Sequence, residues 1–273
     1  MMTRINILVV VICIAIFTSS FLLGDNSSLF LNSFALIVVT SGTLGALFLS
    51  YSARDIWSSL HVAHNAYTTA TPTADEIVDT LMDLSVRSRR KGVLALEDLE
   101  EQTSISFLKR ALGMLVDNYK AEEIRDILYT EMYYFKQRRT QHERLFRHAA
   151  RLAPAFGVAG SVIGLIAMLS GIGDPQVILK TIPIALTSTL YGIVLGNFIL
   201  TPIAENIHSK TTQELMLQKL VNDGVLAING EQNTLRLATK LESFLTPAAR
   251  PKNQDSFDEI RSRVQRLQKE DNA

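Results

Sequence analysis

The fold is decided by residues 152–203, which read LAPAFGVAGSVIGLIAMLSGIGDPQVILKTIPIALTSTLYGIVLGNFILTPI. They contain two apolar runs, 152–172 and 177–203. A helix needs about 20 apolar residues to cross a hydrocarbon core about 30 Å thick, and both runs reach that length. The linker GDPQ at 173–176 has the residue types of a tight turn. These residues therefore predict a hairpin of two transmembrane helices.

A second hairpin is predicted near the N-terminus, where the apolar runs 5–23 and 29–50 are joined by GDNSS at 24–28. The first run resembles a signal peptide. It is longer than the roughly 7–15 apolar residues of such a segment, so we expect it to be retained. The sequence thus predicts transmembrane hairpins at 1–50 and 152–203, with four membrane-spanning helices.

Basic residues give the expected topology. Lys and Arg gather in residues 51–151 and after residue 203, and neither hairpin turn contains any. Because Lys and Arg favour the cytoplasmic side of a membrane, we expect both segments and both termini to be cytoplasmic. The two turns are then periplasmic.

The cytoplasmic parts are also expected to be helical, which makes the fold class all-α. Amphipathic patterning predicts a helical domain at 51–151, in which a long charged helix from Ala121 runs into the third membrane helix. The tail, 204–273, is expected to be helical and solvated to about residue 245. After about residue 247 its polar composition predicts disorder.

The composition excludes several classes of function. Lys and Arg together number 27, as do Asp and Glu, so the formal net charge is +0 and no basic field exists to attract nucleic acid. We find no phosphate-binding glycine loop, nucleophile motif or paired carboxylates, and we do not expect an enzyme. His61 and His64 share a predicted helix face without a third ligand nearby in the sequence. We therefore expect no metal site and no cofactor.

The four apolar runs carry no Asp, Glu, Lys or Arg in their interiors, although intramembrane ionisable residues usually mark ion paths. The third and fourth runs are nevertheless rich in hydroxyl residues, among them Ser161, Ser188 and Thr189. One interpretation is a hydroxyl-lined ion path beside a carboxylate that a partner helix supplies. The alternative is that these hydroxyls bond to carbonyls of the preceding turn and serve packing alone.

Small residues and prolines mark the same two runs. The small residues, which let helix backbones approach closely, are Gly157, Gly160, Gly164, Gly192 and Gly196. Pro154 opens the third run and Pro202 closes the fourth, both at the expected cytoplasmic boundary. The prolines either punctuate helix ends or act as hinges that couple the membrane helices to the cytoplasmic domain.

A charged segment, SRRKGVLALEDLEE at 88–101, lies in the cytoplasmic domain. On a helical wheel Arg90, Glu97 and Glu101 share one face, and Leu96 lies opposite. The segment is either a solvated face with pairs worth about 0.2–1 kcal/mol each, or a charged surface that docks a partner reversibly.

These features together resemble the MotA/PomA family. The resemblance rests on RRKGVLALE at 89–97, APAFGVAGSVIGLI at 153–166, and ALTSTLYG at 185–192 followed by Pro202. It extends over about residues 1–245 and includes the long segment between the second and third membrane helices. The related ExbB/TolQ proteins differ, with three membrane helices and their large loop after the first.

The resemblance implies a stator subunit of the bacterial flagellar motor in the inner membrane. Several copies, thought to be five, surround two copies of a MotB-like, single-span, peptidoglycan-anchored partner that brings the ion-binding aspartate. Flow of H+ or Na+ then drives rotation, and the cytoplasmic domain pushes on a rotor switch protein. By motif match, the residues at the rotor interface are Arg89, Arg90, Glu97 and Asp98.

The same match gives Pro154 and Pro202 the coupling roles, and it places Ser161 and Thr189 near the ion path. Ser161 stands where many members have threonine, which leaves the coupling ion open between H+ and Na+. Pro183 is a further departure within the fourth run. Two alternatives remain: an ExbB/TolQ-like energy transducer that powers another envelope machine, and a structural membrane scaffold without ion flux.

Overall fold

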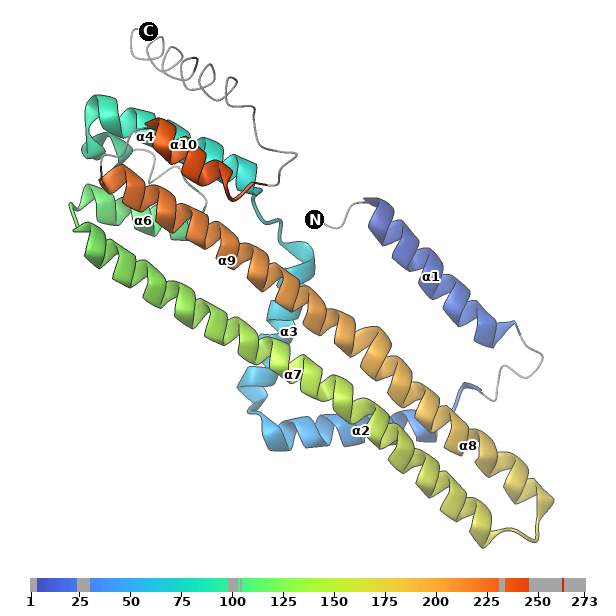
Figure 1. The fold of residues 1–273 in the computed structure, drawn as a ribbon. Coiled ribbons are helices and arrows are strands. Elements are labelled where there is room, and N and C mark those ends of the chain that lie inside the picture. The colour runs from blue at the N-terminus through green and yellow to red at the C-terminus, as the bar shows by residue number, and fades with distance from the viewer. Residues whose placement is uncertain are drawn as a thin grey trace. The chain divides into compact units, whose positions relative to one another are not determined.

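The computed structural model describes residues 4–23, 30–97, 103, 105–230, 234–245 and 262, and within them it contains helices and connections but no strand. The helices are α1 (Arg4–Leu22), α2 (Ser33–Ser50), α3 (Ala53–Thr68), α4 (Ala74–Lys91), the 3-10 helix η2 (Val93–Leu96), α6 (Ser106–Val116), α7 (Ala121–Ser170), α8 (Pro175–Ile193), the π-helix η3 (Val194–Leu200), α9 (Thr201–Asn229) and α10 (Thr234–Glu242) (Figure 1). The predicted all-α class is confirmed.

Three helices in the described part of the chain are long and apolar enough to cross a membrane: α2, α7, and the continuous run of α8 and α9. The long helix predicted from Ala121 is confirmed, since α7 passes without interruption into the third apolar run. The predicted span 5–23 corresponds to α1, and the turn at 24–28 lies outside the described residues.

The second predicted span begins later than expected. α2 starts at Ser33 and not at residue 29, because the side chain of Asn32 caps the helix by accepting a hydrogen bond from the Ala35 N–H at 3.0 Å. Lys180, the one basic residue near the start of the fourth run, lies within the first two turns of α8 and is exposed.

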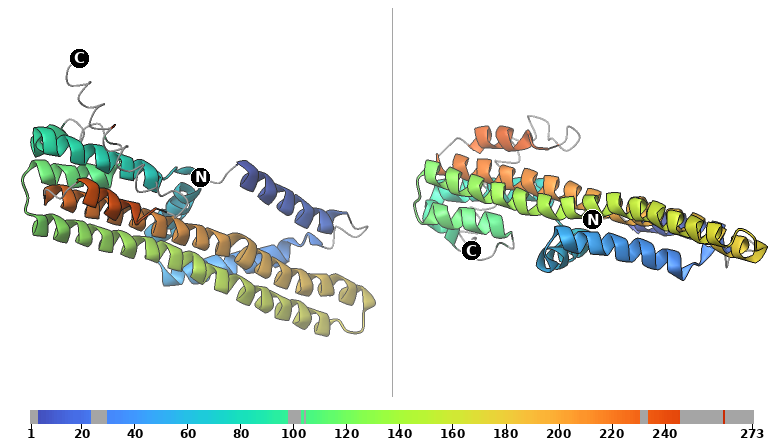
Figure 2. Two further views of the ribbon diagram at one scale, coloured as in Figure 1. Left: turned by 45° about the horizontal axis from the view of Figure 1, so that its top comes forward. Right: turned by 90° about the horizontal axis from the view of Figure 1, so that it is seen from below.

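The chain divides into two compact units. The first contains residues 1–70 and 138–210, and the second contains residues 71–137 and 211–273. In the first unit, α8 runs antiparallel alongside the second half of α7 (Figure 2). The predicted divisions at 151 and 203 followed hydropathy. The units follow packing, so their borders fall inside α7 and α9.

The second unit has a hydrophobic core built from α4, α6, the first part of α7, the later part of α9, and α10. Its largest fully buried side chains are Ile77, Leu81, Leu96, Leu108, Leu112, Ile124, Leu128, Leu220, Leu237 and Leu241. Burial of Leu81 is helped by Gly224, where an added Cβ would lie 2.6 Å from a Leu81 methyl carbon. The start of α4 is fixed by Thr73 and Glu76, which form a capping box.

This core corrects one expectation from the sequence. The tail to residue 245 was expected to be solvated, but α9 and α10 supply Leu220, Val225 and Leu241, all essentially inaccessible to solvent. The physical reason is that their apolar residues recur at helical spacing and find the apolar faces of α4 and α6. Charged residues of the tail occupy the opposite faces, and these dominated the sequence pattern.

The helical wheel assumed for residues 88–101 is also wrong. α4 ends at Lys91, because Gly92 adopts φ 82°, a left-handed value that favours glycine. The 3-10 helix follows, so Arg90 and Glu97 do not lie on one continuous helix. A turn at Asp117 and Asn118, with Asn118 at φ 58°, separates α6 from α7.

Candidate functional site

The interface between α7 and α8 is closed by glycines that let the two backbones touch. A Cβ added to Gly157 would lie 2.9 Å from the Ser188 carbonyl oxygen and 3.2 Å from the Gly192 Cα. A Cβ added to Gly164 would lie 3.0 Å from the backbone nitrogen of Ala185. Any side chain larger than hydrogen at these positions would therefore push the two helices apart. Small residues at such positions are what allow membrane helices to pack closely.

The contact continues to the proline of α7. A Cβ added to Gly192 would lie 2.6 Å from the Ala153 carbonyl oxygen, and one added to Gly196 would lie 2.6 Å from the Ala150 carbonyl oxygen. Pro154 has no N–H to offer to the carbonyl of Ala150, four residues earlier. Gly196 therefore packs its Cα against the place where proline interrupts the hydrogen bonding of α7.

Two hydroxyls meet across this interface. The Ser161 Oγ lies 2.5 Å from the Thr189 Oγ1, and it also donates to the Ala185 carbonyl oxygen at 2.5 Å. A weaker contact of 3.2 Å joins it to the Gly157 carbonyl in its own helix. Both side chains are half-buried. The structure thus brings together two of the three residues that the sequence suggested for an ion path.

The third residue, Ser188, is placed differently. Its side chain is fully buried, and its hydroxyl donates to the Ile184 carbonyl at 2.8 Å within α8. A Cβ added to Gly160 would lie 2.8 Å from the Ser188 Oγ, so this serine fills the space that Gly160 leaves. Its hydrogen bond is the local kind that the packing interpretation described.

Tyr191, which lies in the motif at 185–192, ties α8 to the start of α2. The Tyr191 hydroxyl donates to the Phe30 carbonyl and accepts a hydrogen bond from the Asn32 N–H at 3.0 Å. Farther along α2, the ring of Phe156 packs against Gly42. The bonding partners of Tyr191 lie more than 150 residues away in sequence, so no local pattern could have found them.

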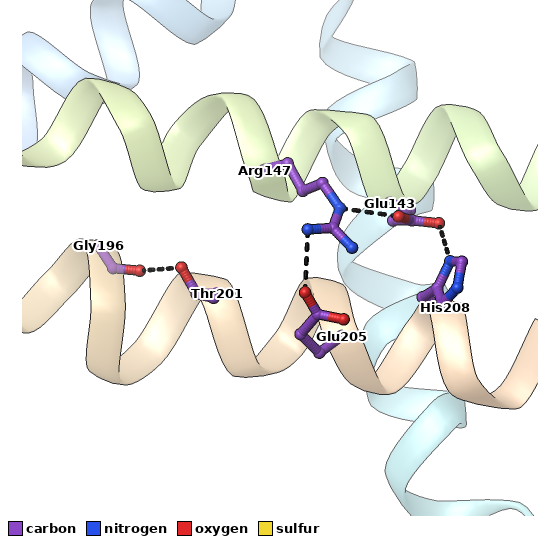
Figure 3. Close-up of polar contacts among 6 residues, drawn as sticks. All are labelled: Glu143, Arg147, Gly196, Thr201, Glu205 and His208. Atoms are coloured by element: carbon purple, nitrogen blue, oxygen red, sulfur yellow. Dashed lines mark hydrogen bonds and ion pairs between the residues drawn. The ribbon is translucent and has the colours of Figure 1, made fainter.

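The π-helix lies directly before Pro202. The Thr201 N–H bonds to the Gly196 carbonyl, five residues earlier, and the Thr201 hydroxyl donates to the same oxygen at 2.9 Å (Figure 3). Pro202 itself is exposed, and its carbonyl accepts a hydrogen bond of 3.4 Å from the Tyr67 hydroxyl. Proline and π-helix together make the irregular backbone of this segment.

A charged network joins α7 to α9 just beyond the proline (Figure 3). The Arg147 guanidinium lies 2.8 Å from a Glu143 oxygen and 2.9 Å from a Glu205 oxygen. The His208 Nδ1 lies 3.0 Å from the other Glu143 oxygen. Glu143 is the best shielded member, with a side chain 14% exposed, while the others are open to solvent and correspondingly screened.

The network shifts the pKa values of Glu143 and Arg147. Burial raises the pKa of Glu143, but hydrogen bonds from Arg147 and His208 outweigh burial and hold that pKa below its ordinary value. Hydrogen bonds to Glu143 and Glu205 raise the pKa of Arg147 above its ordinary value. The sequence could not identify this network, since acidic and basic residues at helical spacing usually form solvated faces.

A half-buried histidine, His142, lies close by on the same helix. Burial lowers the pKa of His142, Arg139 lowers it further, and Asp55 opposes both. The Nδ1 of His142 lies 2.8 Å from the Ser59 hydroxyl of α3. The neutral imidazole is therefore favoured at this contact between α3 and α7.

The residues expected at a rotor interface lie in the second unit. Arg89 and Arg90 are exposed in the last turn of α4, and Glu97 is exposed just after the 3-10 helix. Asp98 lies outside the described residues. The left-handed Gly92 separates the basic pair from Glu97, so the backbone bend sets their relative direction.

Comparison with known proteins identifies relatives over most of the chain. Residues 99–219 match the family described as the MotA/TolQ/ExbB proton channel family. The chain is 30% identical over 235 residues to the uncharacterized protein YtxD of Bacillus subtilis, covering 86% of each chain. It is 28% identical to the chemotaxis protein PomA of Vibrio alginolyticus, over 84% of this chain and 89% of that one. With motility protein A of Borreliella burgdorferi it shares 36% identity, over 64% and 67% of the two chains.

Two solved structures have a similar fold. The flagellar MotAB stator complex from Bacillus subtilis matches with a TM-score of 0.77 and 28% identity, over 92% of this chain and 96% of that chain. The MotAB structure from C. jejuni matches with a TM-score of 0.81 at 22% identity, over 89% of this chain and 96% of that chain, and supports the same fold.

Proposed function

Because the chain belongs to the MotA/PomA group of the MotA/TolQ/ExbB proton channel family, we propose that it is a stator subunit of a flagellar motor. With a MotB-like partner it forms an ion pathway and converts ion flow into torque on the rotor. The ExbB/TolQ-like alternative is less well supported, since the relatives include chemotaxis protein PomA and motility protein A, and the matched structure at 28% identity is a flagellar MotAB stator complex.

The observation that carries this proposal is the Ser161–Thr189 pair. Its hydroxyls can replace part of the hydration shell of an ion, but the apolar runs around them contain no carboxylate in their interiors. The ion-binding acid must then come from a second protein, and a MotB-like subunit would supply it. The pair of hydroxyls is compatible with H+ or Na+ as the coupling ion.

The remaining parts of the assembly follow from this role. We place four helices across the inner membrane, with both termini, the 51–151 segment and the tail on the cytoplasmic side. A ring of five copies would surround the partner. Arg89, Arg90, Glu97 and Asp98 would face the rotor switch protein. Pro154 and Pro202 would couple the membrane helices to that surface, a role that the irregular backbone at 194–202 supports.

Replacement of Thr189 by valine tests the ion path, because valine keeps the shape and removes the hydroxyl. We expect Thr189→Val to reduce ion flux and swimming strongly in cells that also express the partner, while the amount of membrane-inserted protein stays the same. Thr40→Val is the matched control, since Thr40 donates only within α2, to carbonyls of the preceding turn at 2.7 and 3.4 Å. Unchanged flux in Thr189→Val would contradict the proposed path.

A second measurement tests the need for a partner. The purified chain alone, reconstituted in vesicles, should not conduct H+ or Na+, whereas the complex with its partner should. Conduction by the chain alone would overturn the requirement for an external carboxylate. Swimming at varied Na+ concentration then identifies the ion.

A further inference from the structure

One face of helix α3 is buried against other helices of the first unit. Ser59, Ala63 and Ala66 are buried, and the two alanines belong to a small hydrophobic cluster with Phe146 of α7 and Ile207 of α9. The Ser59 hydroxyl adds the 2.8 Å contact to His142. One side of α3 is therefore fixed against α7 and α9.

The opposite face of α3 is apolar and aromatic, yet it is uncovered. Trp57 is 76% exposed, Leu60 50% and Tyr67 49%, and His64 is exposed between them. Positions 57, 60, 64 and 67 follow each other at three and four residues, so they share one helix face. A surface with a tryptophan and a tyrosine this open indicates a partner of some kind.

The position of α3 in the chain indicates which partner. Only Tyr51 and Ser52 separate it from α2, a candidate membrane span, and the chain turns sharply between the two helices (Figure 1). The last turns of α2 expose Leu44, Phe48 and Leu49, the last of these by 91%. The exposed side chains at the end of α2 would face lipid. The apolar face of α3 begins only a few residues later in the chain.

The residue types fit the boundary of a bilayer. Tryptophan and tyrosine concentrate where the acyl chains meet the headgroups, and amphipathic helices lie there with their apolar face roughly 5–10 Å deep. Arg54, exposed in the first turn of α3, is placed to meet lipid phosphates.

We propose that α3 lies in the headgroup layer of the phospholipid leaflet at which α2 ends, with Trp57, Leu60 and Tyr67 inserted between lipids. The inference rests on the proposed membrane span of α2 but not on ion coupling or torque. It gives α3 a mechanical role as well. The Tyr67 hydroxyl contacts the Pro202 carbonyl and the buried face holds Ile207, so lipid anchoring of α3 fixes the start of α9 relative to the membrane surface.

The sequence supplies its own probe, because Trp57 is the single tryptophan of the chain. The full chain with its partner is reconstituted in vesicles of phosphatidylethanolamine and phosphatidylglycerol that contain a lipid brominated at a chosen depth. Subtracting the emission of Trp57→Phe removes the partner's tryptophans. We expect bromines near the headgroup to quench Trp57 more strongly than bromines near the bilayer centre, and aqueous acrylamide to quench it weakly.

A charge on the proposed face should reverse this pattern. Leu60→Glu is expected to lower quenching by the shallow bromines and to raise quenching by acrylamide. Ser58→Glu is the matched control, because Ser58 is exposed on the same helix but off the apolar face. It should behave like the unmodified chain.

Two outcomes would overturn the proposal. Trp57 quenched by acrylamide and untouched by any brominated lipid would mean that this face is in water. Trp57 shielded from both would mean that protein, such as a second copy of the chain, covers it. Ion flux is measured on the same vesicles. Lipid quenching without flux would reject the motor function and leave the lipid contact standing, so the two failures are distinguishable.

Discussion

The Tyr191 hydroxyl accepts a hydrogen bond of 3.0 Å from the Asn32 N–H and donates to the Phe30 carbonyl, which binds α8 to the chain just before α2. Tyr191→Phe removes both bonds, which lie at a partly exposed site. We expect the free energy of unfolding to fall by about 0.5–1.5 kcal/mol, the net contribution of an ordinary hydrogen bond. Thermal unfolding in detergent measures this. Tyr129→Phe, at an exposed position on α7, should change nothing.

Gly196→Ala should separate α7 from the π-helix. The added Cβ would lie 2.6 Å from the Ala150 carbonyl oxygen and 2.9 Å from the Pro154 Cδ, and a backbone atom cannot move aside as a flexible side chain can. Overpacking of this kind costs about 1–3 kcal/mol. The control is Gly45→Ala, a glycine of α2 with nothing within 4 Å of an added Cβ. Equal thermal stability of the two variants would contradict the close contact.

Acid should weaken the network around Glu143. Its pKa is lower in the folded protein than the ordinary value of 4.5, so its stabilising contribution is fully present above 4.5 and is lost as the pH falls through the folded pKa. The unfolding temperature of the unmodified chain should exceed that of Glu143→Gln above pH 4.5. The gap should close in more acidic buffer, and a gap independent of pH would argue against the ionised network.

His142 also makes the folded protein less stable as the pH falls, but it does so at a higher pH than Glu143. Since burial lowers its pKa below 6.5, the unfolded chain takes up the proton first as the pH falls below 6.5, and the folded state loses stability. His142→Gln should remove this part of the pH dependence and leave the more acidic Glu143 part in place. Unfolding temperatures measured on either side of pH 6.5 would show the difference. An unchanged slope in His142→Gln would place the titrating group elsewhere.

Reversing one of the charges proposed to face the rotor should stop rotation and leave ion flux through the membrane part unchanged. Arg90→Glu is expected to abolish or greatly reduce swimming, while ion flux and membrane insertion persist, because charged pairs steer and orient reversible docking. Lys109→Glu, an exposed charge reversal on α6 in the same unit, is the control. Partial rescue of Arg90→Glu by an opposite change on the rotor switch protein would support direct docking. Normal swimming of Arg90→Glu combined with Glu97→Lys would speak against it.

The membrane helices and the long charged helix could be predicted from the sequence because hydropathy and helical period are local signals. The run of apolar residues after Leu152 and the turn at 173–176 together predict a transmembrane hairpin. Gly157, Gly160 and Gly164 indicated a close helix contact for the same reason, since small residues at short spacing serve few other purposes in a membrane.

The features that the sequence does not predict depend on contacts between distant residues or on one backbone angle. The sequence predicts one helix through Gly92, because it does not reveal that the φ of this glycine is positive. The tail was interpreted as solvated, since Leu220 and Leu241 become core residues only when α4 and α6 are present to cover them. The bonds of Tyr191 and Arg147 join helices that the sequence places far apart.

The π-helix at Val194–Leu200 sets the rotational phase of everything that follows it in α9. A π-turn holds one residue more than an α-turn, and one residue corresponds to about 100° of rotation about a helix axis. If this segment became an ordinary α-helix of the same length, the residues after it would rotate by roughly 100° about the helix axis. Glu205 and His208 would then turn away from Arg147 and Glu143, although neither had been altered. Deleting one residue at the same time would remove the extra residue and restore their direction, so the wide turns of this stretch, more than its side chains, set the geometry of the charged network.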